Sequence, residues 1–158
     1  MTWARSARTS NTRSSQFVDV ALKLKQTMEF YMKEILSNDG PKPAGHYSQA
    51  IEHDGLVYVS GQLPINPKSK EKHVGSIEEQ TEQALFNLEA ILRKANSGKN
   101  RVVKVTVYIS DITLWDRVNS VYARFFGDHR PARAIVPTRE LHFGYQIEIE
   151  AIAAVLNK

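Results

Sequence analysis

The segment Gln146–Ala153 constrains the fold more than any other part of the sequence, because apolar residues occupy every second position and two glutamates lie between them. Its apolar series takes the odd-numbered positions: Ile147, Ile149, Ala151, Ala153 and, just beyond the segment, Val155. Successive side chains of a strand point to opposite faces, so this pattern predicts a strand with one buried face and with Glu148 and Glu150 on the other face. The chain must therefore form a sheet with one face packed against a core.

A second extended segment, Pro131–Val136, carries Arg133. The planar guanidinium of arginine matches a carboxylate through paired hydrogen bonds. An arginine at a strand edge, near a strand that carries carboxylates, is typical of a site for a small anion. The residues alone leave another interpretation open, in which Arg133, Glu148 and Glu150 are solvated charges on amphipathic strands.

Composition restricts the class of protein. The 158 residues are enough for one domain, and 42% hydrophobic content can fill a core. The sequence has no cysteine, which excludes disulfides and thiolate chemistry. No apolar run is long enough to span a bilayer. We therefore expect no membrane partner.

The net charge of +4 is unevenly distributed. Residues 1–31 hold five basic and two acidic residues, whereas the rest of the chain holds 16 basic and 15 acidic residues. A nearly neutral body argues against a basic groove for nucleic acid, which needs clustered positive charge.

Residues 1–31 are interpreted as an N-terminal extension to a single domain at 32–158. The first 16 residues are rich in Arg, Ser and Thr and contain no acidic residue. Three interpretations are open: a disordered or loosely helical extension, a mitochondrial presequence, or a segment upstream of a natural start at Met32. We expect a cytoplasmic protein, or a mitochondrial one if the extension is a presequence.

Several short segments before residue 76 predict strands and turns. Met32–Leu36 is expected to be a strand, and Ser37–Gly45 has the composition of a turn. Tyr47–His53 and Leu56–Ser60 predict a hairpin, because Asp54-Gly55 between them is a favoured two-residue turn. Pro64–Gly75 is expected to be a polar loop.

The second half of the chain predicts two helices around a strand. Ser76 and Glu79 form a capping box before an amphipathic helix that Gly98 is expected to end. Val102–Ile109 predicts a strand with Val103, Val105, Val107 and Ile109 on one face. A second helix, capped by Asp111 or Thr113 and ended by Gly127, has an apolar side: Leu114, Trp115, Val118, Val121, Tyr122 and Phe125.

The element order is β-β-β-α-β-α-β-β, which predicts an α+β fold with both helices on one face of the sheet. The other face would carry Tyr108, Ile152, Ala154 and either Val57 or Val59. A half-apolar face without a cover favours an oligomer built through it.

A set of motifs in this order resembles the Rid family, the reactive intermediate deaminases, also called YjgF or L-PSP endoribonucleases. The motifs are Gly45-His46-Tyr47-Ser48-Gln49-Ala50, Val59-Ser60-Gly61-Gln62, the helix Gln80–Leu92, Val102–Tyr108, Pro131-Ala132-Arg133 and Ile147–Ala153. The resemblance runs from about Met32 to Val155. It implies a chorismate-mutase-like α+β fold and a homotrimer with ligand clefts between neighbouring subunits.

The RidA-type branch of this family hydrolyses 2-imino acids, such as 2-iminobutanoate and 2-iminopropanoate, to 2-keto acids and ammonia without metal or organic cofactor. By resemblance, Arg133 holds the substrate carboxylate and Glu148 positions the attacking water. Tyr47 and Ser60 line the cleft, and the backbone at Ile135 contacts the imine or its water. Considered without the family, Tyr47 is equally a core or interface aromatic, and Ser60 is an ordinary hydroxyl at a strand end.

The chain departs from the usual family pattern at a few positions. His46 replaces a proline, and Leu141–Tyr145 replaces a turn that usually contains proline and can reshape the cleft. The five histidines lack metal-type spacing on one helix, so no metal site is expected. His129 and His142 are candidates to border the cleft.

Two other functions are compatible with the sequence. One is ribonuclease activity or inhibition of translation, against which the nearly neutral body argues. The other is a non-catalytic trimer that binds small carboxylates or behaves like a chaperone, because the binding residues would be the same.

Overall fold

The computed structural model describes residues 32–69 and 75–156, so the predictions for residues 1–31 lie outside the described residues. Its strands are β1 Lys33–Ile35, β2 Ala50–His53, β3 Leu56–Gln62, β4 Val102–Ile109, β5 Ala132–Pro137 and β6 Ile147–Ala154. Its helices are α2 Ile77–Lys94 and α3 Trp115–Phe126. The predicted element order is therefore confirmed. No helix in the described ranges is long and apolar enough to cross a membrane.

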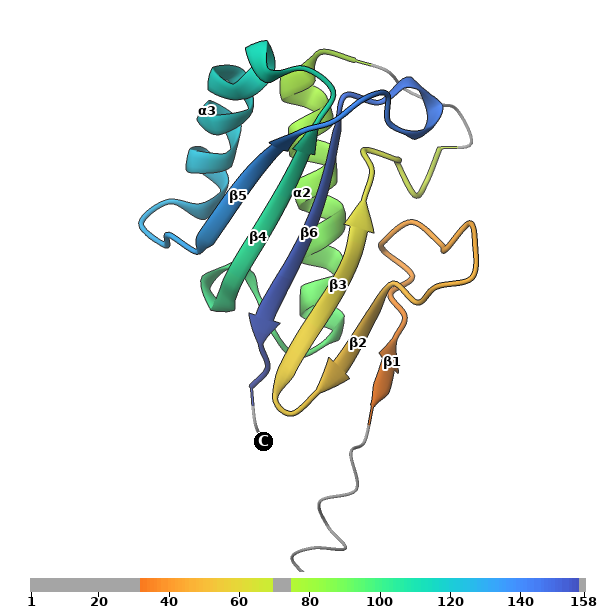
Figure 1. The fold of residues 1–158 in the computed structure, drawn as a ribbon. Coiled ribbons are helices and arrows are strands. Elements are labelled where there is room, and N and C mark those ends of the chain that lie inside the picture. The colour runs from red at the N-terminus through yellow and green to blue at the C-terminus, as the bar shows by residue number, and fades with distance from the viewer. Residues whose placement is uncertain (1–31, 70–74, 157–158) are drawn as a thin grey trace, which may run out of the picture. The chain divides into compact units, whose positions relative to one another are not determined.

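The strands form one six-stranded sheet in the order β1-β2-β3-β6-β4-β5. Neighbouring strands are antiparallel, except that β4 and β5 are parallel and are joined through α3. Figure 1 shows α2 and α3 together behind the sheet. The structure thus confirms an α+β fold with two helices on one face.

The core lies between the sheet and the two helices, and β6 supplies its centre. Ile147, Ile149 and Ala153 are fully buried, as the alternation predicts. They face a row of fully buried residues from α2: Ile77, Leu85, Leu88, Ile91 and Leu92. Burial of one such large side chain contributes on the order of 1.5–3 kcal/mol, so the packing of α2 on β6 fixes which face of the sheet points inward.

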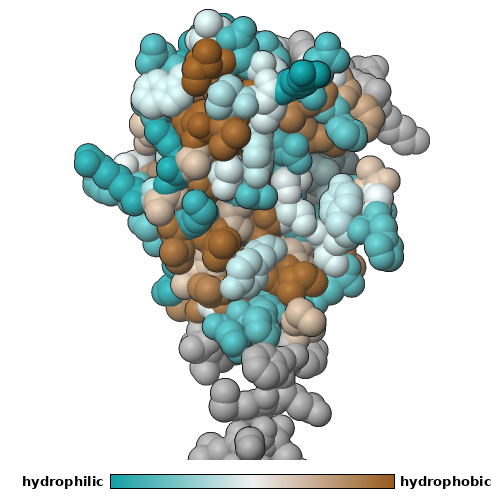
Figure 2. All heavy atoms as spheres, in the orientation of Figure 1, coloured by the Kyte–Doolittle hydropathy of each residue, from teal (hydrophilic) through white to brown (hydrophobic). Residues whose placement is uncertain are grey.

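Within the described residues, no helix covers the opposite face of the sheet. Figure 2 shows apolar side chains gathered over its strands. Tyr58 is 43% exposed there, whereas Val57 and Val59 are buried on the helix side. The expectation that Val57 or Val59 belongs to the uncovered face is therefore wrong, because the Asp54-Gly55 hairpin fixes the opposite alternation for β3.

Two side chains predicted to be buried are exposed. Val103 is 52% exposed because a register shift between Val102 and Lys104 interrupts the alternation at the start of β4. Trp115 is 39% exposed because it begins α3 after a short 3₁₀ turn, Ile112–Leu114, which Asp111 caps. The sequence pattern did not reveal the bulge or the 3₁₀ turn.

The ends of α2 show one prediction confirmed and one corrected. Ser76 and Glu79 form the predicted capping box. The helix is closed by Asn96 at φ 53°, not by Gly98, which has an extended φ of −175°. The amide of Ser97 donates to the Leu92 carbonyl and that of Asn96 donates to the Arg93 carbonyl, which is the Schellman pattern.

Asn96→Ala is expected to destabilise the fold by about 1 kcal/mol, because alanine adopts the left-handed conformation less readily than asparagine. Asn96→Gly should preserve or increase stability for the same reason. Urea unfolding followed by circular dichroism measures both variants. Equal midpoints for the alanine and glycine variants would contradict the assignment of Asn96 as the residue that ends α2.

Candidate functional site

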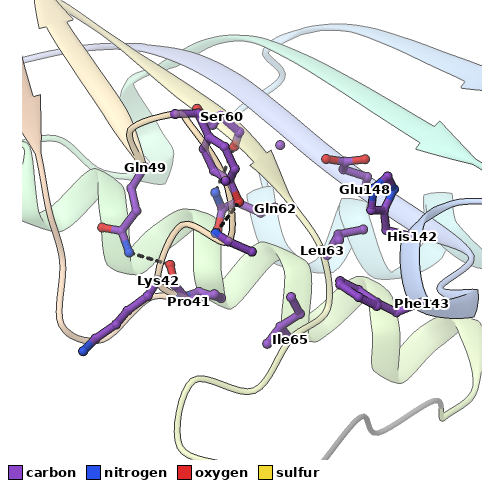
Figure 3. Close-up of a pocket in the computed structure, with 14 residues that line it drawn as sticks. Pro41, Lys42, Gln49, Ser60, Gln62, Leu63, Ile65, His142, Phe143 and Glu148 are labelled. Atoms are coloured by element: carbon purple, nitrogen blue, oxygen red, sulfur yellow. Dashed lines mark hydrogen bonds between the residues drawn. The ribbon is translucent and has the colours of Figure 1, made fainter. Parts of the chain in front are cut away.

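A cleft of about 480 Å³ opens where β3 loses its regular pairing with β6. The register shifts between Val59 and Gln62, which places Ser60 and Gly61 in a bulge beside β6. Figure 3 shows the side chains that surround this space. The cleft is lined by Pro41, Lys42, Ala44, Gly45, Tyr47, Gln49, Ser60, Gly61, Gln62, Leu63, Ile65, His142, Phe143 and Glu148.

The carboxylate of Glu148 lies directly against the backbone of Gly61. A Cβ added at Gly61 would overlap it, with Glu148 Cδ only 2.8 Å away. Glycine is therefore required by the close approach of the carboxylate, and the bulge in β3 makes room for an acidic side chain within the sheet.

Partial burial raises the pKa of Glu148 above its usual value of 4.5. The nearby His142 lowers the pKa, and the neighbouring carboxylate of Glu150 raises it. Figure 3 shows the His142 ring close to this carboxylate. A half-buried carboxylate with a raised pKa can accept a proton from a water more readily than a solvated one.

Tyr47 and Ser60 border the same cleft from the side of β2 and β3. The Tyr47 side chain is 51% exposed, and its hydroxyl accepts a hydrogen bond from the amide of Ala44 at 3.2 Å. The Ser60 hydroxyl donates to the Ser48 carbonyl at 2.7 Å. This bond gives Ser60 a structural role in joining β3 to the segment before β2.

Buried amide side chains hold the loops around the cleft. Gln49, 2% exposed, accepts from the amide of Ser37 and donates to the carbonyls of Ser37 and Pro41. Asn87 of α2 donates to the carbonyls of Leu63 and Ile65 at 3.0 and 2.9 Å. The cleft is therefore supported by hydrogen bonds whose loss would leave buried polar groups without partners.

Arg133 lies in a different place. Its guanidinium stacks on the face of Tyr122 at 4.5 Å from the ring centroid and lies 5.9 Å from that of Trp115. In the described part of the chain it has no carboxylate partner, so these aromatic contacts hold the cation while its N–H groups stay available to an anion. Burial raises the pKa of Tyr122 to about 12, and Arg133 opposes this shift.

The five residues predicted to form the site do not all meet within one chain. Tyr47, Ser60 and Glu148 line the cleft. Arg133 and Ile135 pair with Val105 and Val107 of β4, so their side chains point to the helix side, whereas Glu148 pairs with Tyr108 on the uncovered face. Within one chain, β4 separates the strands of Arg133 and Glu148, and their side chains lie on opposite faces of the sheet, so the grouping of these two residues in one site stays a prediction.

The structure adds residues to which the motifs gave no role. Gly61 belongs to a motif, but only the tertiary contact with Glu148 shows why glycine is there. Leu63, Ile65 and Phe143 form apolar parts of the cleft. For Phe143, the nearest sequence signal was the unusual segment Leu141–Tyr145.

The two histidine candidates have different positions. His142 lines the cleft, as expected. His129 bonds to the Val102 carbonyl at 2.7 Å and lies in the separate hollow that contains Arg133. Within residues 32–69 and 75–156, no group of three or more His, Asp or Glu side chains is arranged to hold a metal ion.

Comparison with known proteins identifies the family to which this fold and this cleft belong. The model of the family described as Endoribonuclease L-PSP matches residues 37–155. A RutC family protein of Pyrococcus horikoshii is 46% identical over 123 residues, which cover 77% of this chain and 98% of the relative. The chain therefore belongs to the L-PSP endoribonuclease family, the Rid family that its motifs resemble.

Solved structures agree with this assignment. A putative endoribonuclease of Thermotoga maritima has 45% identity and a TM-score of 0.76, covering 79% of this chain and 98% of that one. E. coli TdcF, solved with bound serine, has 31% identity and a TM-score of 0.74, covering 78% of this chain and 99% of that one. The YjgF-type fold predicted from the sequence is thereby confirmed.

Gly61→Ala is expected to displace the Glu148 carboxylate toward solvent, because the added methyl group overlaps it. The pKa of Glu148 should then fall toward 4.5, since regained hydration favours the charged form. Carbon-13 NMR titration of the glutamate carboxyl groups measures this change. Gly98→Ala is the control, because a Cβ there meets nothing within 4 Å. An unchanged Glu148 pKa in Gly61→Ala would contradict the proposed contact.

Proposed function

We propose that this protein hydrolyses reactive 2-imino acids, such as 2-iminobutanoate and 2-iminopropanoate, to 2-keto acids and ammonia. The observation that carries the proposal is the Glu148 carboxylate, half-buried against Gly61 in an open cleft, with its pKa raised by burial. Membership of the Rid family supports the same reaction class.

The active site of this proposal is completed by a second copy of the chain. Arg133 has no anion partner among the described residues and is separated from Glu148 by β4, so a substrate bound by both needs Arg133 from an adjacent subunit. The uncovered, partly apolar face of the sheet supplies a surface for such an assembly. We infer a homotrimer, which is the arrangement that the family resemblance implies.

The reaction requires little of the protein beyond placement. Water oxygen forms a bond to C2 of the protonated imine while Glu148 accepts one water proton, which gives a carbinolamine. The proton then passes from Glu148 to the nitrogen, the C–N bond breaks, and ammonia leaves as the hydroxyl group gives its proton back to Glu148 and the carbonyl forms. Orientation of the water against an already electrophilic carbon can supply much of the acceleration.

Arg133 fixes the other end of the substrate. Its planar N–H groups pair with the substrate carboxylate and offset the charge of a site that already contains Glu148. The Ile135 side chain packs against the core, and its backbone belongs to β5, which among the described residues is an edge strand. That edge can provide a backbone hydrogen bond to the imine or its water.

A second candidate is a protein that binds small carboxylates without catalysis. The favouring observation is E. coli TdcF, which was solved with bound serine. The same Arg133 clamp would serve both functions, so they differ only in the rate of imine loss.

Arg133→Lys is expected to slow imine hydrolysis by about ten- to a hundredfold, because lysine keeps the charge but loses the paired hydrogen bonds. Glu148→Gln should be similarly slow while still binding a 2-keto acid through Arg133. A threonine dehydratase supplies 2-iminobutanoate, and the rate of semicarbazone formation reports how much imine escapes hydrolysis.

Arg130→Lys is the matched control, because Arg130 lines the same hollow as Arg133 and is exposed. It should retain the parent rate. If the parent protein binds 2-keto acids but does not accelerate imine loss, the non-catalytic function is correct. Parent rates in both Arg133→Lys and Glu148→Gln would remove these residues from the mechanism.

Mixed assemblies of the two inactive variants are expected to regain activity. If each site takes one residue from each of two adjacent subunits, random refolding of equal amounts of Arg133→Lys and Glu148→Gln chains should restore about a quarter of the parent rate. Unmixed variants refolded in the same way serve as controls. No recovery in mixtures that assemble normally, as judged by light scattering, would show that the site belongs to one chain.

A further inference from the structure

Beside Glu148, the cleft has an apolar wall that the proposed chemistry does not use. Leu63, Ile65 and Phe143 line the cleft together with Glu148, and all three are at least partly exposed. In Figure 3 they lie on the side of the cleft away from Ser60. Exposure of apolar side chains to water is unfavourable, so their presence at a site for small charged molecules indicates that they contact an apolar part of the ligand.

Phe143 is the most unusual residue of this wall. Its side chain is 47% exposed, and its backbone adopts φ 63°, a conformation that residues with large side chains rarely take. Its ring meets those of His142 and Tyr145 edge to face, with centroid distances of 5.8 and 6.4 Å. Backbone strain that presents an exposed aromatic ring to a cleft suggests a functional role for that ring.

The wall is held in place from α2. Asn87 binds the carbonyls of Leu63 and Ile65, while Gln80 accepts from the amide of Gln146 at 2.8 Å and so anchors the start of β6 just after Phe143. Tyr145, 3% exposed, anchors the same turn in the interior. The wall is therefore supported from both sides, as a surface that selects ligands must be.

We propose that Leu63, Ile65 and Phe143 form the side-chain pocket of the site, and that this protein prefers 2-imino acids with bulky apolar side chains over the alanine-derived imine. This inference rests on the proposed function. C2 of the substrate carries a carboxylate, an imine nitrogen and a side chain. With the carboxylate on Arg133 of an adjacent subunit and C2 beside Glu148, the apolar wall receives the side chain.

The test compares imines generated from leucine, phenylalanine and alanine by an L-amino acid oxidase with catalase present. In the parent protein, kcat/KM for the bulky imines should exceed that for the alanine imine by about tenfold, the low end for an apolar pocket that stays open to water. Phe143→Asn should lower this ratio to nearly one, and asparagine is chosen because it tolerates the same backbone conformation.

Ile65→Ala should lower the ratio in the same direction. Phe86→Asn is the matched control, because Phe86 is 57% exposed on α2 and lies outside the cleft. It should keep the parent ratio. A parent ratio of one or less, or a parent ratio retained in Phe143→Asn, would overturn the inference.

Measurements of 2-keto acid binding test this inference independently of the proposed reaction. Calorimetry with 4-methyl-2-oxopentanoate and with pyruvate measures the same side-chain preference without turnover. A preference for the larger acid that Phe143→Asn removes supports the pocket even if the parent protein hydrolyses no imine, in which case only the proposed function fails. Equal affinities for the two acids in the parent protein would overturn the pocket.

Discussion

The packing of one face of β6 against α2 is the constraint on which the rest of the structure depends. Because Ile147 and Ile149 are fully buried against the helix, β6 cannot shift by one residue without exposing its whole apolar series. The same register turns Glu148 to the other face and brings it opposite the bulge at Gly61. The position of the acidic group in the cleft is thus a direct consequence of core packing.

Polar groups buried in α2 extend this constraint to the loops. Asn87 and Gln80 are buried, with 1% and 2% of their surface exposed. Their side-chain amides form hydrogen bonds with backbone groups of the segments that surround the cleft. A buried side-chain amide without a hydrogen-bond partner would lower the stability of the fold. Each loop is therefore fixed at the backbone group that pairs with one of these amides. The helix therefore determines both the sheet and the walls of the cleft.

Under the proposed function, the separation of Arg133 from Glu148 means that each chain holds two incomplete half-sites. One is a cleft with an acid whose pKa is raised, and the other is a guanidinium held on the faces of Tyr122 and Trp115. Each half is held by contacts within the chain, so each is preorganised before any partner arrives. The proposed function therefore requires the assembly of copies, because one small acid is bound at its two ends by residues that lie apart within a single chain.

The sequence by itself determined the elements that depend on local pattern: the alternation of β6, the Asp54-Gly55 hairpin, the capping box at Ser76 and the order of strands and helices. It also pointed to Tyr47, Ser60 and Glu148, which share the cleft, through motifs that span most of the domain.

Only the tertiary structure decided what depends on contacts between distant segments. The bulges at Val103 and Gly61 result from pairing with β6, and the orientation of Arg133 toward Tyr122 results from contact between β5 and α3. Alternation predicts which residues share a face of one strand. It does not predict where a neighbouring strand adds a residue, and so it could not show that Arg133 and Glu148 lie on opposite faces of the same sheet.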